Sequence, residues 1–212
     1  RTSGDCSVVV GGKFNSTGSA GYSFIGGGIS NVGNTATSIG GGRQNTTSNS
    51  YATISGGYRN TSSGSKSGVL GGQCNTASGS YSTISGGYLN TSSSLASSVG
   101  GGRKNLAQGI YSKIGGGICN NTCNATSNCL ALGSVVVGGV GNNTTGGTWD
   151  LATCVFTVAP TICNVGSMSF VGGGFQNRVT GDCSVVVGGR NNLACVGTSF
   201  VGGGNTNIAS AF

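Results

Sequence analysis

The sequence has almost no side chains that could carry acid–base chemistry. Its 212 residues include no histidine and no glutamate, and the three acidic residues, Asp5, Asp150 and Asp182, lie far apart along the chain. General acid–base catalysis ordinarily employs a histidine, or two carboxyl groups with different pKa values. We therefore expect a protein that is not an enzyme and that holds no cofactor.

Proline, charge and long apolar segments are also scarce, and each shortage excludes a class of protein. A single proline beside 45 glycines excludes a collagen triple helix. No apolar run reaches about 18 residues, so no membrane span is expected, and the N-terminus lacks the apolar core of a signal peptide. The ten Lys and Arg residues give a net charge of +7, but they lie singly apart from Arg103–Lys104, which disfavours nucleic-acid binding.

What the chain has instead is one motif repeated twelve times. Glycine stands three and four residues before each of twelve asparagines, and Ile or Val stands six residues before it. The unit reads Ser-x-(Ile/Val)-x-Gly-Gly-x-x-Asn, and most successive copies are 15 residues apart. Short repeats in which apolar and small residues alternate are typical of solenoids with stacked coils. The sequence therefore predicts an all-β fold: a single parallel β-solenoid (β-roll) of about twelve 15-residue coils over residues 1–212, with two loop insertions.

The repeat also predicts which side chains lie inside each coil. One Ile or Val per coil should form a buried file: Val9, Ile25, Ile39, Ile54, Val69, Ile84, Val99, Ile114, Val136, Val171, Val186 and Val201. The asparagines should form a structural ladder, each amide bonding its neighbours or the turn backbone: Asn15, Asn31, Asn45, Asn60, Asn75, Asn90, Asn105, Asn120, Asn142, Asn177, Asn192 and Asn207. Some of these asparagines begin glycosylation sequons, and we prefer the ladder, which would hide them from a glycosyltransferase.

One stretch of the repeat carries a resemblance to a known family. The segment Ala77-Ser-Gly-Ser-Tyr-Ser-Thr-Ile-Ser-Gly86 resembles the head repeats of trimeric autotransporter adhesins, whose unit is close to Ala-x-Gly-x-x-Ser-x-Ala-x-Gly. Similar Gly-Gly-x-x-Asn arrays resemble those of fibre and surface proteins of phages and large viruses. The resemblance implies left-handed β-rolls and a trimer. This chain departs from the bacterial heads in its longer unit, its inward Ile or Val, and its nine cysteines, which favours a virus or phage.

Two insertions interrupt the repeat, near residues 121–134 and 143–165. Insertions in solenoids emerge as loops on one side and often bind ligands. The second contains the only tryptophan and the only proline of the chain, and the sequence Trp149-Asp150 followed by Phe156 suits contact with carbohydrate or protein. Trp149 and Phe156 could equally cover the flank of the solenoid. We take Trp149, Asp150 and Phe156 as the candidate binding loop.

Five of the nine cysteines lie in or beside the insertions: Cys119, Cys123, Cys129, Cys154 and Cys163. This enrichment predicts disulfides that replace missing coil contacts, with Cys154–Cys163 as one pair and another among Cys119, Cys123 and Cys129. A zinc site is the rival interpretation, although the chain has no histidine and these spacings include no Cys-x-x-Cys. Because nine is odd, at least one thiol stays free or bonds another chain.

These features together predict a structural or adhesive fibre or spike protein at a virion surface or in an extracellular setting, with receptor binding as a possible role. The alternatives are a bacterial extracellular adhesin head and an ice-binding β-solenoid. Outward apolar residues at both ends of the repeat array, Val8 and Phe24 and then Val135, Phe170, Val185 and Phe200, predict a homo-oligomer, with a trimer favoured. Further expected partners are other virion or cell-surface proteins and a host glycan or receptor.

Overall fold

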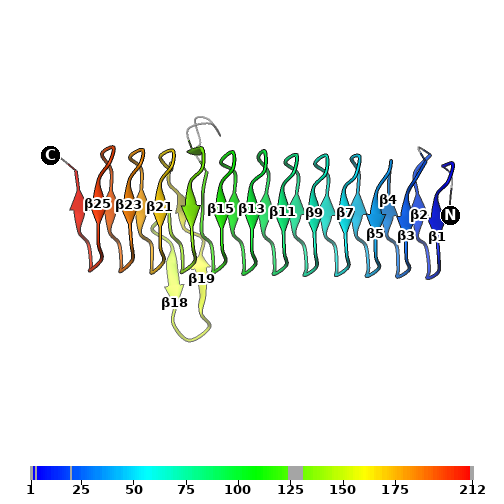
Figure 1. The fold of residues 1–212 in the computed structure, drawn as a ribbon. Helices are drawn as coiled ribbons and strands as arrows, with labels where there is room; N and C mark the ends of the chain where they lie inside the picture. The colour runs from blue at the N-terminus through cyan, green and yellow to red at the C-terminus, as the bar shows by residue number, and fades with distance from the viewer. Residues whose placement is uncertain (1, 3, 20, 124–130, 211–212) are drawn as a thin grey trace. The chain divides into compact units, whose positions relative to one another are not determined.

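The fold is an all-β parallel solenoid of about 13 turns with a spacing of about 15 residues. The computed structural model describes residues 2, 4–19, 21–123 and 131–210, and α-helix is absent from these residues. There is accordingly no helix, in those ranges, of the length and apolarity that a membrane crossing needs. The chain divides into two compact units, Arg1–Gly101 and Gly102–Phe212, and both are built from the same coil (Figure 1).

In the first unit each coil contributes one short strand to each of two parallel sheets. The first sheet consists of β1 (Val8–Val9), β3 (Phe24–Ile25), β5 (Ser38–Ile39), β7 (Thr53–Ile54), β9 (Gly68–Val69), β11 (Thr83–Ile84) and β13 (Ser98–Val99). The second consists of β2 (Ser16–Thr17), β4 (Val32–Gly33), β6 (Thr46–Thr47), β8 (Thr61–Ser62), β10 (Thr76–Ala77) and β12 (Thr91–Ser92). Equivalent residues of successive coils lie side by side, for example Ile54 beside Val69.

The second unit repeats this arrangement and adds an insertion. Its first sheet consists of β15 (Lys113–Ile114), β16 (Val135–Val136), β21 (Phe170–Val171), β23 (Val185–Val186) and β25 (Phe200–Val201). The opposite side carries β14 (Leu106–Ala107) and a sheet of β22 (Arg178–Val179), β24 (Leu193–Ala194) and β26 (Ile208–Ala209). The inserted strands are β17 (Thr144–Thr145), β18 (Thr148–Asp150), β19 (Val155–Val158) and β20 (Thr161–Ile162).

The expected file of Ile and Val residues is confirmed. From Ile25 to Val201 every member is buried, and only Val9 in the first coil is half-buried. The residue before each of them in the strand points away from the core, so that Thr83 is exposed while Ile84 is buried. Strands of two residues can bury one apolar side chain each, and the stability of the fold therefore comes from stacking.

The asparagines form the ladder by hydrogen bonds within their own coil and to the next one, as Asn60 illustrates with three. Its Oδ1 accepts a hydrogen bond from the backbone N–H of Asn75 at 3.0 Å, and its Nδ2 donates to the carbonyls of Gly56 at 3.1 Å and of Gly72, in the next coil, at 2.9 Å. Eleven ladder asparagines are at most 4 % exposed, and Asn207 in the last described coil is exposed. A buried amide with satisfied donors stabilises the stack, and the sequon asparagines are inside the coils.

Buried hydroxyl groups form pairs in some coils. Ser62 and Ser67 are hydrogen-bonded at 2.7 Å, and Ser92 and Ser97 at 2.8 Å. Between these two coils the same column holds Ala77, in register with Ser62 and Ser92. The buried hydroxyl of Ser82 consequently has no hydrogen-bond partner among the described residues. The coil of Ala77 is therefore one hydrogen bond short of its neighbours.

This gap predicts a stabilising substitution. Ala77→Ser should place a hydroxyl opposite Ser82 and raise the free energy of unfolding by about 1 kcal/mol, because a buried donor and acceptor gain a partner. The control is Ser62→Ala, which should lower it by a similar amount. Chemical unfolding followed by far-ultraviolet circular dichroism measures both changes, and a destabilised Ala77→Ser protein would contradict the pairing.

Two adjacent glycines of one coil should differ strongly in how much stability they lose when replaced by alanine. Gly72 has a φ of +84°, and a Cβ there would lie 2.3 Å from the Gly87 carbonyl oxygen and 2.7 Å from Asn75 Nδ2. Around Gly71 a Cβ would meet nothing within 4 Å. Gly72→Ala should therefore cost about 3 kcal/mol or more, through backbone strain and the clash with the ladder. Gly71→Ala should cost less than about 1 kcal/mol, and equal melting temperatures for the two variants would contradict this geometry.

Candidate binding site at the inserted hairpin

The insertion after Asn142 folds into an antiparallel hairpin in two tiers, which we call the arm (residues 144–162). At its base β17 pairs with β20, and beyond them β18 pairs with β19. The register places Trp149 opposite Phe156, with an irregularity between Thr148 and Trp149. Figure 1 shows β18 and β19 extending to one side of the coils of the second unit, with the turn at their far end. The repeat thus changes from parallel stacking to a projecting element at this point.

Three aromatic rings hold the arm against the coils. The ring centroids of Trp149 and Phe156 are 5.0 Å apart, and that of Trp149 lies 5.9 Å from that of Phe175, both pairs meeting edge to face. Phe156 and Phe175 are stacked at 6.2 Å. Phe175 belongs to the coil that follows the arm, and all three rings are half-buried. Such contacts contribute about 0.5–1.5 kcal/mol per pair beyond their buried area, so the cluster positions the arm.

The carboxylate of Asp150 accepts hydrogen bonds within the turn of the arm. Its Oδ1 accepts a hydrogen bond from the Ala152 backbone N–H at 2.8 Å, and its Oδ2 accepts one from the Thr153 hydroxyl. The hydrogen bond from Thr153, and then that from the Ala152 backbone, lower the pKa of the Asp150 carboxyl below its usual value. Of the three residues taken from the sequence as a binding loop, Trp149 and Phe156 belong to the ring cluster, and Asp150 stabilises the turn.

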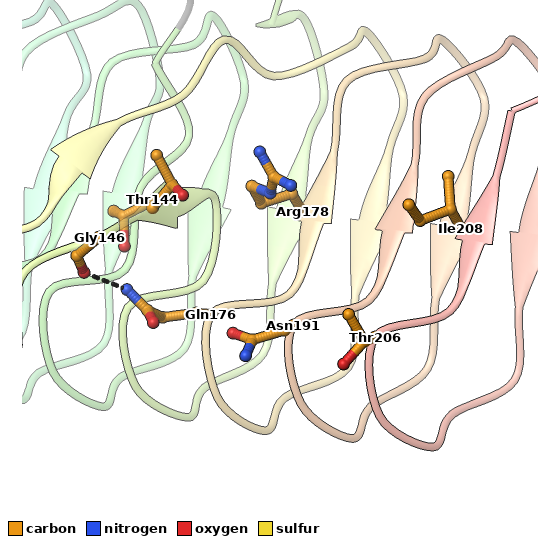
Figure 2. A pocket seen from close by; sticks show the side chains of 8 residues that line it. Thr144, Gly146, Gln176, Arg178, Asn191, Thr206 and Ile208 are labelled. Carbon is orange, nitrogen blue, oxygen red and sulfur yellow. Dashed lines mark hydrogen bonds between the residues drawn. The ribbon is translucent and has the colours of Figure 1, made fainter.

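Two clefts lie beside the arm on either side of Gln176. The larger has a volume of about 520 Å³ and is lined by Gly147, Thr148, Trp149, Leu151, Phe175, Gln176 and Arg190. The smaller has a volume of about 280 Å³ and is lined by Thr144, Thr145, Gly146, Gln176, Arg178, Asn191, Thr206 and Ile208 (Figure 2). The Gln176 Nε2 donates a hydrogen bond to the Gly146 carbonyl at 2.6 Å and so bridges the coil and the arm between the clefts.

The clefts carry positive charge without a neutralising partner. Arg178 is half-buried in the smaller cleft, and the Arg190 guanidinium lies 5.3 Å from the centroid of the Phe175 ring in the larger. The acids of this unit are engaged elsewhere, since Asp150 bonds its own turn and Asp182 accepts a hydrogen bond from the Ser167 backbone N–H at 2.7 Å. In the part of the chain that the structure describes, neither guanidinium forms an ion pair.

The cysteines are not arranged as the sequence suggested. All eight described cysteines have free thiols, so the expected pair Cys154–Cys163 is not formed, and Cys119 and Cys123 are unpaired too. Cys154 lies in the turn at the end of the arm, whereas Cys163 follows β20 at its base, and the length of the hairpin separates them. Burial raises the pKa of the Cys119 and Cys123 thiols. Cys129 lies outside the described residues.

The positions of the described side chains do not support the alternative interpretation of the cysteines as a zinc site. Within residues 2, 4–19, 21–123 and 131–210, no three His, Cys, Asp or Glu side chains come together in a way that could hold a metal ion.

Sequence reasoning missed most of the residues that line the clefts. Phe175, Gln176, Arg178, Arg190 and Asn191 occupy variable positions of ordinary coils, and nothing in the repeat marks them. Their common property is position: they lie just before or after the ladder asparagine in the coils that follow the arm. An outward position in the coils next to an insertion is the signal that could have identified them.

A third surface feature bears on the ice-binding alternative. On the outward side of the second sheet of unit 1, Thr46, Thr61, Thr76 and Thr91 lie in register on successive coils. The column passes to Val32 beyond Thr46, and its threonines are half-buried. A regular array of hydroxyls is therefore present over four coils only.

Comparison with known proteins adds no identity. No model of a protein family matches the sequence, and no curated protein matches it either.

Proposed function

We propose that the chain is a structural and adhesive protein of a fibre or spike on a virus or phage particle, with the coils as shaft and the arm as the element that contacts a receptor. The observation that carries the proposal is the arm: an ordered hairpin, held by three aromatic rings beside two clefts, in otherwise uniform coils. Loops carried by a rigid scaffold are where binding residues concentrate.

The chemistry of the coils supports a shaft. The inward Ile and Val file and the asparagine ladder contact the next coil, and the hydroxyl pairs such as Ser62–Ser67 bond within a coil. Each coil contacts mainly its neighbours, and the stack gains stability by repetition. Such a scaffold suits the presentation of a site at a distance from its base.

The choice of a virus or phage over a bacterial adhesin rests on the departures from the bacterial repeat. The inward residue is Ile or Val at all twelve positions, where the bacterial unit has alanine, and the chain has nine cysteines. The placement of the protein at a virion surface is part of this proposal. The same scaffold also supports the bacterial alternative, and the experiment has to separate the two.

Removal of the arm tests the adhesive function. We expect a fluorescently labelled chain to bind a subset of cells in a panel of bacterial and eukaryotic types, as counted by flow cytometry. A variant with residues 148–158 replaced by a short Gly-Ser turn should lose this binding, because the aromatic cluster loses Trp149 and Phe156 and the larger cleft loses one wall. Its circular dichroism spectrum should remain that of the coils, and binding that persists undiminished would contradict the proposal.

Immunogold electron microscopy on cultures of the source organism distinguishes a protein of a virus or phage particle from a bacterial adhesin. Antibody against the chain should decorate particles in the virus or phage case. Labelling of bacterial envelopes alone would establish the adhesin alternative instead.

Assembly of the shaft is the second part of the proposal. In unit 2 the outward residues Val135, Phe170, Val185 and Phe200 lie in register on four successive coils. Phe200 is 65 % exposed, and in the next outward column Val137 is 52 % exposed. The arm packs on Phe175 and leaves Phe200 open. Contiguous apolar surface of this kind is typical of protein contacts, and we propose that it joins copies of the chain into a homo-oligomer, with a trimer favoured.

The proposed homo-oligomer can be tested by the mass of the protein in solution. Light scattering on the 212-residue chain at micromolar concentration should give a mass of more than one chain, and Phe200→Ser should shift it towards the monomer. Lys113→Ser, on the same sheet but away from the apolar column's exposed end, is the control and should leave the mass unchanged. A wild-type monomer would overturn this part of the proposal.

A further inference from the structure

The two clefts lie next to each other and share the wall residue Gln176, whose hydrogen bond to the Gly146 carbonyl stands between them. Their volumes, about 520 and 280 Å³, are of the order found for small-molecule sites, roughly 300–1,000 Å³. The larger cleft is apolar and aromatic on one side, and the smaller one is polar. A ligand that fits both therefore has an apolar face at one end and several hydrogen-bonding groups at the other.

The aromatic half suits a sugar ring. Trp149 and Phe175 are half-buried, meet edge to face with centroids 5.9 Å apart, and line the same cleft as Leu151. Half-exposed aromatic rings offer a flat apolar surface to the C–H groups of a pyranose, and the indole N–H adds a donor. Arg190, above the Phe175 ring, adds further donors at this end.

The polar half is built from a column that repeats along the coils. Gln176, Asn191 and Thr206 each stand one residue before a ladder asparagine, in left-handed backbone conformations with φ of +49°, +54° and +60°. Figure 2 shows their side chains in line on three successive coils. Coils stack about 4.8 Å apart, so the column offers an amide, an amide and a hydroxyl at regular intervals. These groups both donate and accept, as the hydroxyls of an oligosaccharide require.

Arg178 makes the polar half selective for an anion. Its guanidinium is half-buried in the cleft, and no carboxylate of the described residues pairs with it. Arginine presents a planar set of donors that matches a carboxylate or sulfate with two parallel hydrogen bonds. The next two positions of the same outward column are Leu193 and Ile208. The charge of the polar half is thus one guanidinium beside polar groups, unlike the basic track that a nucleic-acid backbone requires.

From these observations we propose that the clefts bind an oligosaccharide with an anionic sugar. The carboxylate or sulfate lies against Arg178, its neighbouring hydroxyls against Asn191 and Thr206, and an adjoining sugar ring against Trp149 and Phe175. This inference rests on the proposed function, since it names the ligand of the adhesive site.

The fluorescence of the chain tests the site directly, because Trp149 is its only tryptophan and lines the larger cleft. The full chain is titrated with sialyllactose as a carboxylated probe, a chondroitin sulfate tetrasaccharide as a sulfated probe, and lactose and chitotetraose as neutral ones. We expect a saturable change in tryptophan emission with at least one anionic probe, and roughly tenfold weaker binding or more for the neutral probes. The comparison of sialyllactose with the chondroitin sulfate tetrasaccharide distinguishes a carboxylated from a sulfated ligand.

Matched variants separate the site from general charge attraction. Arg178→Gln should weaken binding of the anionic probe roughly tenfold or more, and Arg178→Lys should lose less because it keeps the charge. Lys113→Gln removes one positive charge from an exposed residue of the same unit, outside the clefts, and should leave affinity within about twofold. Unchanged thermal melting of the three variants establishes that the fold is intact.

Results that contradict the binding of an anionic sugar can be distinguished from results that contradict the adhesive function. Equal losses in Arg178→Gln and Lys113→Gln would reduce the binding to unspecific electrostatics and overturn the inference. So would neutral probes that bind as tightly as anionic ones, or no binding of any probe. In those cases the adhesive function stands if replacement of the arm still abolishes binding to cells, and the receptor contact is then of another chemistry.

Discussion

The side-chain amide of one asparagine per coil is the interaction on which the rest of this structure depends. It accepts a hydrogen bond from the next asparagine's backbone and donates to glycine carbonyls in its own coil and in the next. Because each amide bonds two coils, the conformation of one coil fixes that of its neighbour. The close approach of the amide to the glycine backbone also explains why a glycine stands at that corner in every copy: at Gly72 a Cβ would occupy the space of the ladder itself.

The ladder also explains how the second unit accommodates a long insertion. The backbone N–H of Asn142 donates to Asn120 Oδ1 at 3.0 Å across 22 residues, and that of Asn177 donates to Asn142 Oδ1 at 3.0 Å across 35 residues. These distances equal those between ordinary coils. In the arm, the extra residues therefore leave the stack before the next coil begins and return to it in register. An insertion of this kind can vary in sequence without disturbing the coils beneath it, which is the property that a binding element requires.

The fold could be predicted from the sequence because the same physical requirement recurs in every coil. A buried position such as Ile84 or Asn90 is constrained by the coils on both sides, and twelve copies make the constraint visible. The candidate site could be predicted only in part. Trp149 and Phe156 stood out by their rarity, but Gln176 and Arg178 become site residues solely because the arm folds beside them. The outward positions of Gln176 and Arg178 carry no periodic signal, since neighbouring coils do not restrict them.

Two expectations show where local sequence was insufficient. Trp149 and Asp150 are adjacent, yet they have different roles, because the turn requires the carboxylate as an acceptor. Cys154 and Cys163 are close in sequence, but the hairpin between them is extended, and an extended hairpin separates its turn from its base. Both outcomes follow from the pairing of β18 with β19, which composition alone does not reveal.

Burial of the ladder has a consequence for the chemical ageing of the protein. Asparagine deamidates when the backbone nitrogen of the following residue attacks its side-chain carbonyl. For Asn60 that nitrogen belongs to Thr61 and is held in a hydrogen bond to the Asn75 carbonyl at 2.8 Å, while the amide itself is fully buried. The attack is blocked twice, by geometry and by the exclusion of water. If a ladder residue were converted to aspartate, two donors would be lost and a negative charge would face two carbonyl oxygens. The interior of the stack is thus protected from this slow damage.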